Sequence, residues 1–525
     1  MKKKRGDRGV PSVPSRAACR YVFAPEGEFV AAFHPAAARW ISEPLTPAGI
    51  RSIRETLAPS LEIPLTPRGF VRAADRVRPG ETDPIGYDAV WVRDAVWAWF
   101  ALREDPRRRG DARRLLLALW DYYGSRAQIA RFDDVLARPE HGEDRLRVPH
   151  IRFDGNSPSL DDVTFRGKPV DWNHKQNDAH GLFLIALAAA AWEGSLTARD
   201  LTAGRYAALL RFPAFFDAIR FERYEDAGAW EEIDRRNTSS IGLVTRALQL
   251  WRALAVPAKG DGPAGPFVAA LRKKLGAEKG AAGFVWREEC LSALAARGLA
   301  AVRRQLELGG ESPDYDPGDI RYRQADACLI ALLFPSPLEG LTGAERRSVL
   351  QIVDTLKRPA GVIRYVNDSY QSGNAWIRRG ERQTPAAPVE TADASGHAAF
   401  LDRFRGFIPH TEAQWFFDSL LVPARLEAAF AAEDPLLKKR DLFLAAVHLK
   451  RALGQLTGNM CGEEPVAADG AAVPTLLPPE SINTVILRGK ALLLPSPVVP
   501  LNWARAALAL ALNRLEMALP GEGLS

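Results

Sequence analysis

Helical periodicity is the feature that most constrains this chain. Apolar residues, mostly Ala and Leu, recur with Arg at three- and four-residue spacing, which is typical of helices with one buried face. Alternating Val, Ile and Thr runs are few and short, which excludes a β-sandwich and a parallel α/β protein. The fold is therefore predicted to be all-α. The pattern predicts ten clear helices, over residues 89–103, 111–130, 178–192, 239–255, 286–307, 323–334, 343–356, 411–432, 436–454 and 503–517.

The domain organisation follows from length and from the absence of linkers. A chain of 525 residues is long enough for two to four ordinary domains. However, no low-complexity stretch separates two self-contained sets of helices. We therefore expect one large helical domain over residues 41–525. Residues 1–40 contain Pro, Arg and Gly without periodicity, and they predict a short irregular extension that is flexible or loosely docked.

Composition narrows the function classes. Apolar residues make up 47% and charged residues 26%, which is ordinary globular usage. Lys and Arg (70) exceed Asp and Glu (64) by too little to indicate a nucleic-acid partner. Apolar runs fall short of the roughly 18–20 residues that a membrane span needs, and no secretory signal pattern precedes Pro25. We expect a soluble cytoplasmic protein with no membrane partner and an unknown oligomeric state.

The sequence contains no motif that indicates a cofactor-binding or metal-binding protein. Gly260, Gly262 and Gly265 satisfy GxGxxG, but Pro263 interrupts the motif and no strand precedes it, which favours a surface loop. The four cysteines lie far apart and form no CxxC pair. P-loop, HExxH and GxSxG motifs are absent from the sequence. We expect no cofactor and no metal.

Two adjacent glutamates stand out among the long loops between helices. Glu231 and Glu232 follow Trp230 and precede the capping residues of a predicted helix. A carboxyl packed against an indole loses solvation, so its pKa should rise, as a general acid working near neutral pH requires. A solvated acidic loop beside a packed Trp230 is an equally good interpretation of these residues alone.

Polar and aromatic clusters recur before other predicted helices. Trp91, Arg93 and Asp94 could present a donor fork, an acceptor and a stacking surface to a sugar, although structural salt bridges use the same pair. Asn177 and Asp178 form a second such cluster, and a third extends from Arg364 to Trp376. Recurrence of this kind indicates several loops that converge on one pocket.

Six segments, in order, resemble glycoside hydrolase family 15. This family contains the glucoamylases, with phosphorylase kinase subunits as relatives, and the chain is most similar to its bacterial branch. The segments are DAVWVRDAVW (88–97), PHIRFDG (149–155), WNHKQNDAHGLFL (172–184), AGAWEEIDRRNTSSIG (227–242), IRYVNDSYQSGNAW (363–376) and PLNWARAALALA (500–511). The resemblance implies an (α/α)6 barrel with its active site in loops at one end.

The resemblance also implies roles for residues in these segments. Glu231 would be the general acid, and Glu232 would bind the sugar beyond the scissile bond. The remaining substrate-binding residues implied are Trp91, Arg93, Asp94, Asn177, Asp178, Trp230, Arg364 and Trp376.

The general base is less well matched by the sequence. The family base lies shortly before the closing helix, and Glu480 is the corresponding candidate. The residues after it depart from the family pattern, and a different register would place Thr475 there, with no carboxylate. Glu463 and Glu464 are outside candidates.

These implications give a leading hypothesis and an alternative. The first is an exo-acting, inverting α-glucosidase of the glucoamylase type, which releases glucose from non-reducing ends of α-glucans or oligosaccharides. The alternative is a catalytically silent glucan-binding or regulatory protein similar to the phosphorylase kinase subunits. A carboxylate facing Glu231 across the pocket would favour the enzyme.

Overall fold

The structure is a computed structural model of the chain. It describes residues 18–74, 86–165, 167–256, 265–373, 375–376, 389–390, 397–468, 470–487 and 490–519.

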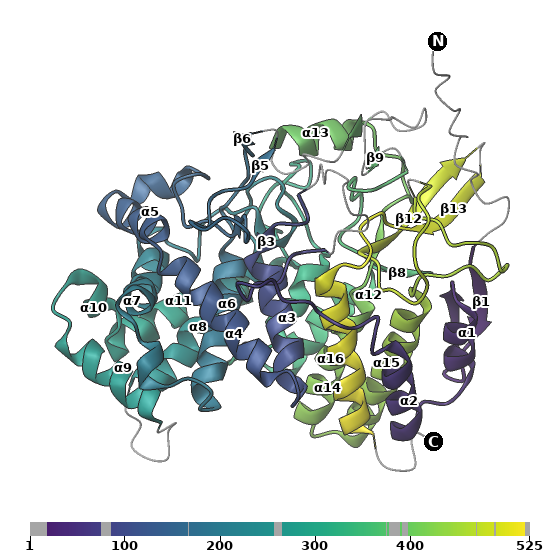
Figure 1. Cartoon of the computed structure of the whole chain (residues 1–525), viewed down its shortest axis with the longest axis horizontal. Coiled ribbons are helices and arrows are strands. Elements are labelled where there is room, and N and C mark those ends of the chain that lie inside the picture. The colour runs from purple at the N-terminus through teal and green to yellow at the C-terminus, as the bar shows by residue number, and fades with distance from the viewer. Residues whose placement is uncertain are drawn as a thin grey trace, which may run out of the picture.

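Within this described part, six elements form a closed inner ring. Figure 1 shows the barrel from the side, with most of its long helices below the strands and loops of one end. Each of the six elements contacts the next in order along the chain, and the last contacts the first. This arrangement confirms the predicted all-α (α/α)6 fold. The inner elements are α3 (Val92–Glu104), α6 (Asn177–Trp192), α8 (Thr238–Ala255), the 3-10 helix η4 (Ala327–Leu332), α14 (Asp418–Ala431) and α16 (Asn502–Ala518).

A second layer of helices surrounds the ring. α4 packs against α3, α11 against α8, α12 against η4, α15 against α14 and α2 against α16, while α7 packs against α4. These outer helices are α2 (Pro47–Leu57), α4 (Arg109–Tyr123), α7 (Ala203–Ala218), α11 (Glu288–Leu308), α12 (Gly343–Asp354) and α15 (Pro435–Gly454). The remaining described helices are α1 (Pro35–Ser42), α5 (Arg126–Ala137), α9 (Pro266–Ala277), α10 (Ala281–Val285), α13 (His397–Arg405), η1 (Pro139–Glu143), η2 (Ala198–Asp200) and η3 (Gly228–Trp230).

The core of the ring is aromatic and tightly packed. Trp97 of α3 stacks on Trp503 of α16 with ring centroids 6.1 Å apart, and Phe416 packs edge-on against Trp503. α6 and α8 approach closely at Gly181, where a Cβ would lie 2.8 Å from the backbone of Leu243. Inner helices are buried on most sides, which explains their Ala-rich, nearly continuous apolar sequences.

A small sheet covers the end of the barrel that carries the long loops. Its five strands run in the order β13-β12-β11-β8-β7, and Gln414 of β11 pairs with Ile482 on one side and with Ile363 on the other. Four of its strands lie in residues 357–410 and 456–502, which separate helices in the sequence prediction and were expected to be loops for that reason. The strands are β7 (Lys357–Arg358), β8 (Gly361–Ile363), β11 (Gln414–Trp415), β12 (Ser481–Leu487) and β13 (Lys490–Pro495).

The other described strands form four separate two-stranded sheets. Near the same end, Trp91 pairs with Arg152 across strands β3 and β4. The pairs are β1 (Arg20–Phe23) with β2 (Phe29–Ala32), β3 (Val90–Trp91) with β4 (Arg152–Phe153), β5 (Thr164–Phe165) with β6 (Lys168–Pro169) and β9 (Ala375–Trp376) with β10 (Val389–Glu390).

Several helix predictions need correction. The helix expected over 111–130 is two helices, because the chain turns at Gly124 and Ser125 caps α5. The helix expected from residue 411 begins at Asp418, because residues 414–415 pair in the sheet. The helix expected over 323–334 is only the short 3-10 helix η4, because Arg323 and Asp326 form isolated β-bridges with Ser312 and Tyr365. Helices α1, α2, α7, α9, α10 and α13 were not predicted.

The predicted N-terminal extension is only partly described. Residues 1–17 lie outside the described residues, as do Gly260, Gly262 and Pro263 of the interrupted glycine motif. Residues 18–40 correct the expectation of irregular structure, because they form β1, β2 and most of α1. Trp40 of α1 is buried in a cluster with helix α15, which fixes this segment to the barrel.

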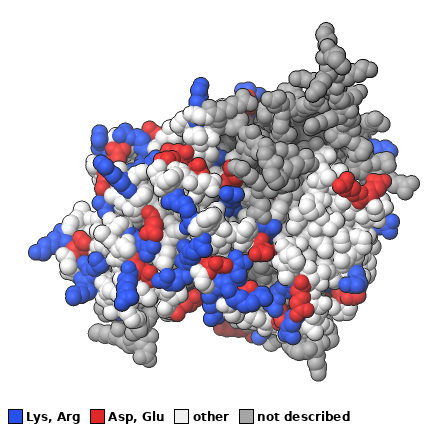
Figure 2. Space-filling view, viewed as in Figure 1, with Lys and Arg blue, Asp and Glu red and all other residues white. Residues whose placement is uncertain are grey.

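Surface charge is mixed on the face shown in Figure 2. Lys and Arg side chains alternate with Asp and Glu, and the described residues on this face form no continuous basic surface. In the part of the chain that the structure describes, no helix combines the length and the apolar character needed to span a bilayer.

Candidate active site

The predicted site residues converge on one end of the barrel. Trp91 immediately precedes α3, Asp178 lies in the first turn of α6, and Glu231 follows η3, just before α8. Glu480 comes from the segment that leads into β12. Figure 1 shows this end as the region of loops and strands β3, β8 and β12 beyond the helix ends.

Arg93 joins the first two clusters that the sequence indicates. Its Nε donates to Asp178 Oδ2 (2.6 Å) and its Nη2 to Gln176 Oε1 (2.6 Å). Its Nη1 donates to Glu231 Oε1 (3.1 Å). One buried guanidinium therefore fixes the relative positions of α3, α6 and the loop that bears Glu231.

Glu231 is largely buried, and its carboxyl lies between the Arg93 guanidinium and the Trp91 indole. Its backbone adopts the left-handed conformation (φ 59°), and its side chain is 15% exposed. Trp91 Nε1 donates to its Oε2 (3.3 Å). Burial raises the pKa of Glu231, against the opposing charges of Arg93 and Arg152. This direction agrees with the expectation for a general acid.

Glu232 lies in the opposite environment. It is 2% exposed and accepts hydrogen bonds from Arg364 (2.8 Å), Arg403 (3.1 Å) and Tyr365 (2.7 Å). Burial favours the neutral form, but the surrounding guanidiniums, with Arg323 3.6 Å away, outweigh it and lower the pKa of Glu232 to about 2. The rise expected for both glutamates is therefore wrong for Glu232.

Glu480 is another buried carboxyl with a raised pKa, as are Asp226 and Glu311 elsewhere in the described barrel. Tyr87 donates to its Oε1 (2.7 Å), and Gln371 and Ser496 donate to its Oε2. Burial raises the pKa of Glu480 to about 7, although these hydrogen bonds oppose the rise. The Tyr87 ring lies 5.5 Å from Trp91, so a chain of contacts joins Glu480 to the group that binds Glu231.

Asp94 lies near both of these carboxylates. Burial raises its pKa to about 7, opposed by Arg93 and reinforced by the negative charges of Glu231 and Glu480. In contrast, Thr475, Glu463 and Glu464 are exposed. Among the base candidates of the sequence, only Glu480 is buried next to the predicted sugar-binding residues.

Of the remaining predicted residues, Trp230, Arg364 and Asn177 lie in the same region. Trp230 donates its Nε1 to both oxygens of Asp326 (3.0 Å). Arg364 binds Asp368 through Nε and Nη2 (2.6 Å each) and lies 5.0 Å from the Trp230 ring. The backbone N–H of Asn177 donates to Asp226 (2.8 Å). The side chain of Trp376 lies outside the described residues.

Some site residues escaped the sequence interpretation. Tyr87 and Gln371 bind Glu480, and Arg403 binds Glu232. Gln371 and Arg152 lie inside segments that resemble the family, but no local signal distinguishes them there. Arg403 could not have been found, because helix α13 is brought to Glu232 by tertiary packing alone.

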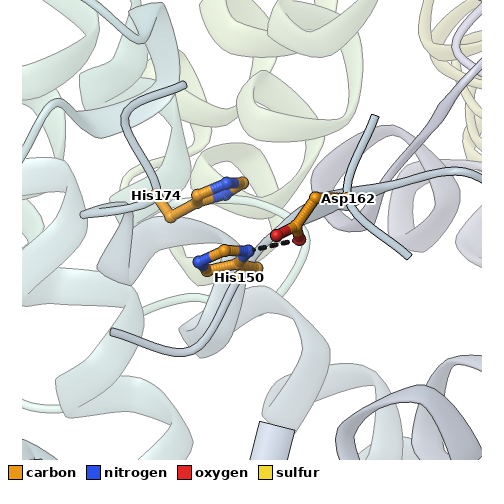
Figure 3. Close-up of side chains that lie close together, drawn as sticks. All are labelled: His150, Asp162 and His174. Carbon is orange, nitrogen blue, oxygen red and sulfur yellow. Dashed lines mark hydrogen bonds and ion pairs between the residues drawn. The ribbon is translucent and has the colours of Figure 1, made fainter. Parts of the chain in front are cut away.

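One cluster near the site has metal-ligating residue types. His150, Asp162 and His174 place a ligand atom each within 4.8 Å of one another. Figure 3 shows the two imidazoles stacked, with centroids 3.6 Å apart. His150 uses Nδ1 on Asp162 (2.6 Å) and Nε2 on Leu146 O (2.9 Å), so both its ring nitrogens are occupied. The cluster is explained by stacking and hydrogen bonding.

Comparison by sequence gives short matches to uncharacterised proteins. No family model matches the chain. It is 41% identical over 145 residues to the uncharacterized lipoprotein YgeQ of Escherichia coli K12, which is 27% of this chain and 55% of that protein. It is 37% identical over 59 residues to the putative protein YgeP of the same strain, 11% of this chain and 60% of that protein. The chain thus spans little more than half the length of these curated relatives.

Solved structures match a larger share of the chain than the sequence relatives do. A wild-type glycosidase matches with a TM-score of 0.51 and 18% identity, over 90% of this chain and 96% of that one. The glucoamylase from Saccharomycopsis fibuligera matches with a TM-score of 0.51 and 13% identity, over 95% of this chain and all of that one. The chain therefore has the (α/α)6 fold of glucoamylases.

Proposed function

We propose that the chain is a glycoside hydrolase of the glucoamylase family, family 15, which releases glucose from the non-reducing ends of α-glucans or oligosaccharides. The observation that supports this most is the pair Glu231 and Glu480. Both carboxyls are buried with raised pKa values, and both belong to one contact chain through Trp91 and Tyr87. A silent glucan-binding protein would have no need for the second carboxylate.

The proposed chemistry divides the work between these two groups. Glu231, protonated, donates its proton to the glycosidic oxygen as the C–O bond breaks. Glu480, ionised, takes a proton from the water that attacks the anomeric carbon from the opposite face. An inverting enzyme needs a separation of roughly 6.5–9.5 Å between the two carboxyls for this water. Each group contributes a factor of roughly 10²–10⁴ to the rate.

The surrounding residues hold the terminal glucose. Asp94, Arg93 and Arg364 offer acceptors and donors for its hydroxyls, while Trp91 and Trp230 offer ring faces for its C–H groups. Glu232 has a different proposed role from the one that the resemblance implies. Because Arg364, Tyr365 and Arg403 occupy its oxygens, Glu232 acts as their counter-charge and orients Arg364 towards the sugar.

Cellular location stays a prediction. The sequence favours the cytoplasm, whereas the name of the Escherichia coli relative describes a lipoprotein. Fractionation of the native host, with an antibody against the chain, distinguishes a cytoplasmic from a membrane-associated protein.

The proposed activity can be tested with a panel of maltose, isomaltose, trehalose and longer malto-oligosaccharides. Proton NMR during the first minutes identifies the anomer released. β-Glucose as the first product supports the inverting mechanism, and α-glucose contradicts it. Absence of glucose from every substrate, with folded protein, overturns the assignment as a hydrolase. Glu231→Gln is the control for contaminating glucosidases.

A further inference from the structure

Arg152 is enclosed by the aromatic residues of the site. It lies on β4 directly opposite Trp91 of β3, and its side chain is 2% exposed. Its guanidinium carbon is 4.4 Å from the ring centroid of Trp91 and 4.0 Å from that of Trp172. Trp91 and Trp172 meet edge to face, so the guanidinium lies in the angle between the two rings. The planar guanidinium of arginine can pack flat on an indole face, whereas the ammonium of lysine cannot.

We infer that Arg152 is a positioning residue for the general acid, because it fixes the indole that binds Glu231 and supplies a second positive charge beside that carboxyl. This inference rests on the proposed role of Glu231. Arg152 itself contacts the Trp91 ring, and Trp91 transmits the position through its Nε1–H, which donates to Glu231 Oε2.

The packing around Arg152 restricts the Trp91 indole on several sides. Trp172 meets it edge-on with centroids 5.7 Å apart, and Tyr87 lies 5.5 Å away. Gly86 closes on the guanidinium so tightly that a Cβ there would lie 2.3 Å from Arg152 Nη2. Its φ of +69° also favours glycine. The indole nitrogen therefore has little freedom to leave Glu231.

The charge of Arg152 acts in addition to that of Arg93. Burial raises the pKa of Glu231, and Arg93 and then Arg152 lower it. Asp94, from the same turn of α3 as Arg93, adds a negative charge nearby. When Glu231 gives its proton to the glycosidic oxygen it becomes a carboxylate, and Arg152 stabilises that charge in the transition state. Without Arg152 the acid would hold its proton too strongly.

Two substitutions separate packing from charge. Arg152→Gln removes both, so kcat should fall ~10²-fold with a smaller change in KM, and the limb of the pH profile that reports Glu231 should move to higher pH. Arg152→Lys keeps the charge but loses the broad planar group that contacts both indoles, so kcat should fall ~10-fold while that limb stays in place. Arg147→Gln is the matched control, since Arg147 is 42% exposed and pairs with Asp134.

A second readout does not depend on activity. Titration of the ¹³C-labelled glutamate carboxyls by NMR, with the Glu231 signal assigned by its loss in Glu231→Gln, gives the pKa of Glu231 directly. A higher pKa in folded Arg152→Gln supports the inference, and an unchanged pKa overturns it. If the wild type hydrolyses no α-glucoside while this pKa still shifts, the proposed function fails and the electrostatic coupling stands.

Discussion

Glu231 and Glu232 are neighbours in sequence, yet the structure places them in opposite surroundings. Glu231 faces indole and one edge of a shared guanidinium, and burial raises its pKa. Glu232 faces Arg364, Arg403 and Arg323, which lower its pKa to about 2. The left-handed backbone at Glu231 turns the chain between them. One residue is thereby suited to give up a proton, and the other to remain charged.

The difference shows that the effect of burying a carboxylate depends on the charges around it. A buried carboxylate with few cations is destabilised as an anion, and it gains reactivity from that. A buried carboxylate among several cations stabilises the fold, because removing it would leave those cations unpaired. The comparison therefore predicts that substitutions at the two positions affect different properties.

The largest expected effect is on catalysis at Glu231. Glu231→Gln should lower kcat about 10³-fold, because the amide cannot donate a proton to the leaving oxygen. The free energy of unfolding should not fall, since a partly desolvated acid is removed. Initial rates on the best α-glucoside and urea unfolding at neutral pH measure both quantities. If Glu231→Gln keeps its activity, or loses activity only because the protein unfolds, Glu231 does not differ from Glu232 in the way proposed.

The second effect is on stability at Glu232. Glu232→Gln should lower the free energy of unfolding by about 3–5 kcal/mol, because Arg364 and Arg403 lose a buried counter-charge. The control is Glu140→Gln, at an exposed position.

The pH dependence sharpens this prediction. The pKa of Glu232 is lowered from 4.5 to about 2, so its contribution is present above pH 4.5 and is lost as the pH falls towards 2. The difference in urea stability between wild type and Glu232→Gln should therefore shrink on acidification across this window. A difference that stays constant would show that the ion pairs contribute nothing.

The smallest expected effect is on the pH dependence of stability at Glu480, whose pKa is raised by burial as that of Glu231 is. Its pKa is raised from 4.5 to about 7, so the folded state binds an extra proton between these values and loses stability as the pH rises through 7. Glu480→Gln should lack this loss. The free energy of unfolding of Glu480→Gln, relative to that of the wild type, should be about 3 kcal/mol more favourable at about pH 8 than at about pH 4.5. If the difference in unfolding free energy between the variant and the wild type is the same at both pH values, the pKa of Glu480 is not raised in the folded state.

Part of the fold was accessible from local pattern alone. The inner helices α3, α6, α8 and α16 are long and strongly apolar, so their periodicity identified them. The five-stranded sheet was not accessible, because Gln414 finds its partners at residues 363 and 482, and short strands depend on such distant pairing. The break at Gly124 has a similar origin, since Gly204 of another helix contacts it there.

The site shows the same limit at the level of single residues. Residue types identified Trp230 and the glutamates, and the resemblance assigned Glu231 and Glu480 different roles. The opposite pKa shifts of Glu231 and Glu232 could not be predicted, because they depend on Arg323 and Arg403, which are 91 and 171 residues from Glu232 along the chain. Electrostatic environment is a tertiary property even where its participants are adjacent.

The closure of the ring by α16 against α3 has a consequence for biosynthesis. The Trp97–Trp503 stack joins residues separated by most of the chain, and Asn502 binds the backbone of Arg72. During translation, α3 leaves the ribosome long before α16 is synthesised. The face of α3 that packs on α16 therefore stays exposed during that time. We expect the nascent barrel to depend on chaperones until α16 is released.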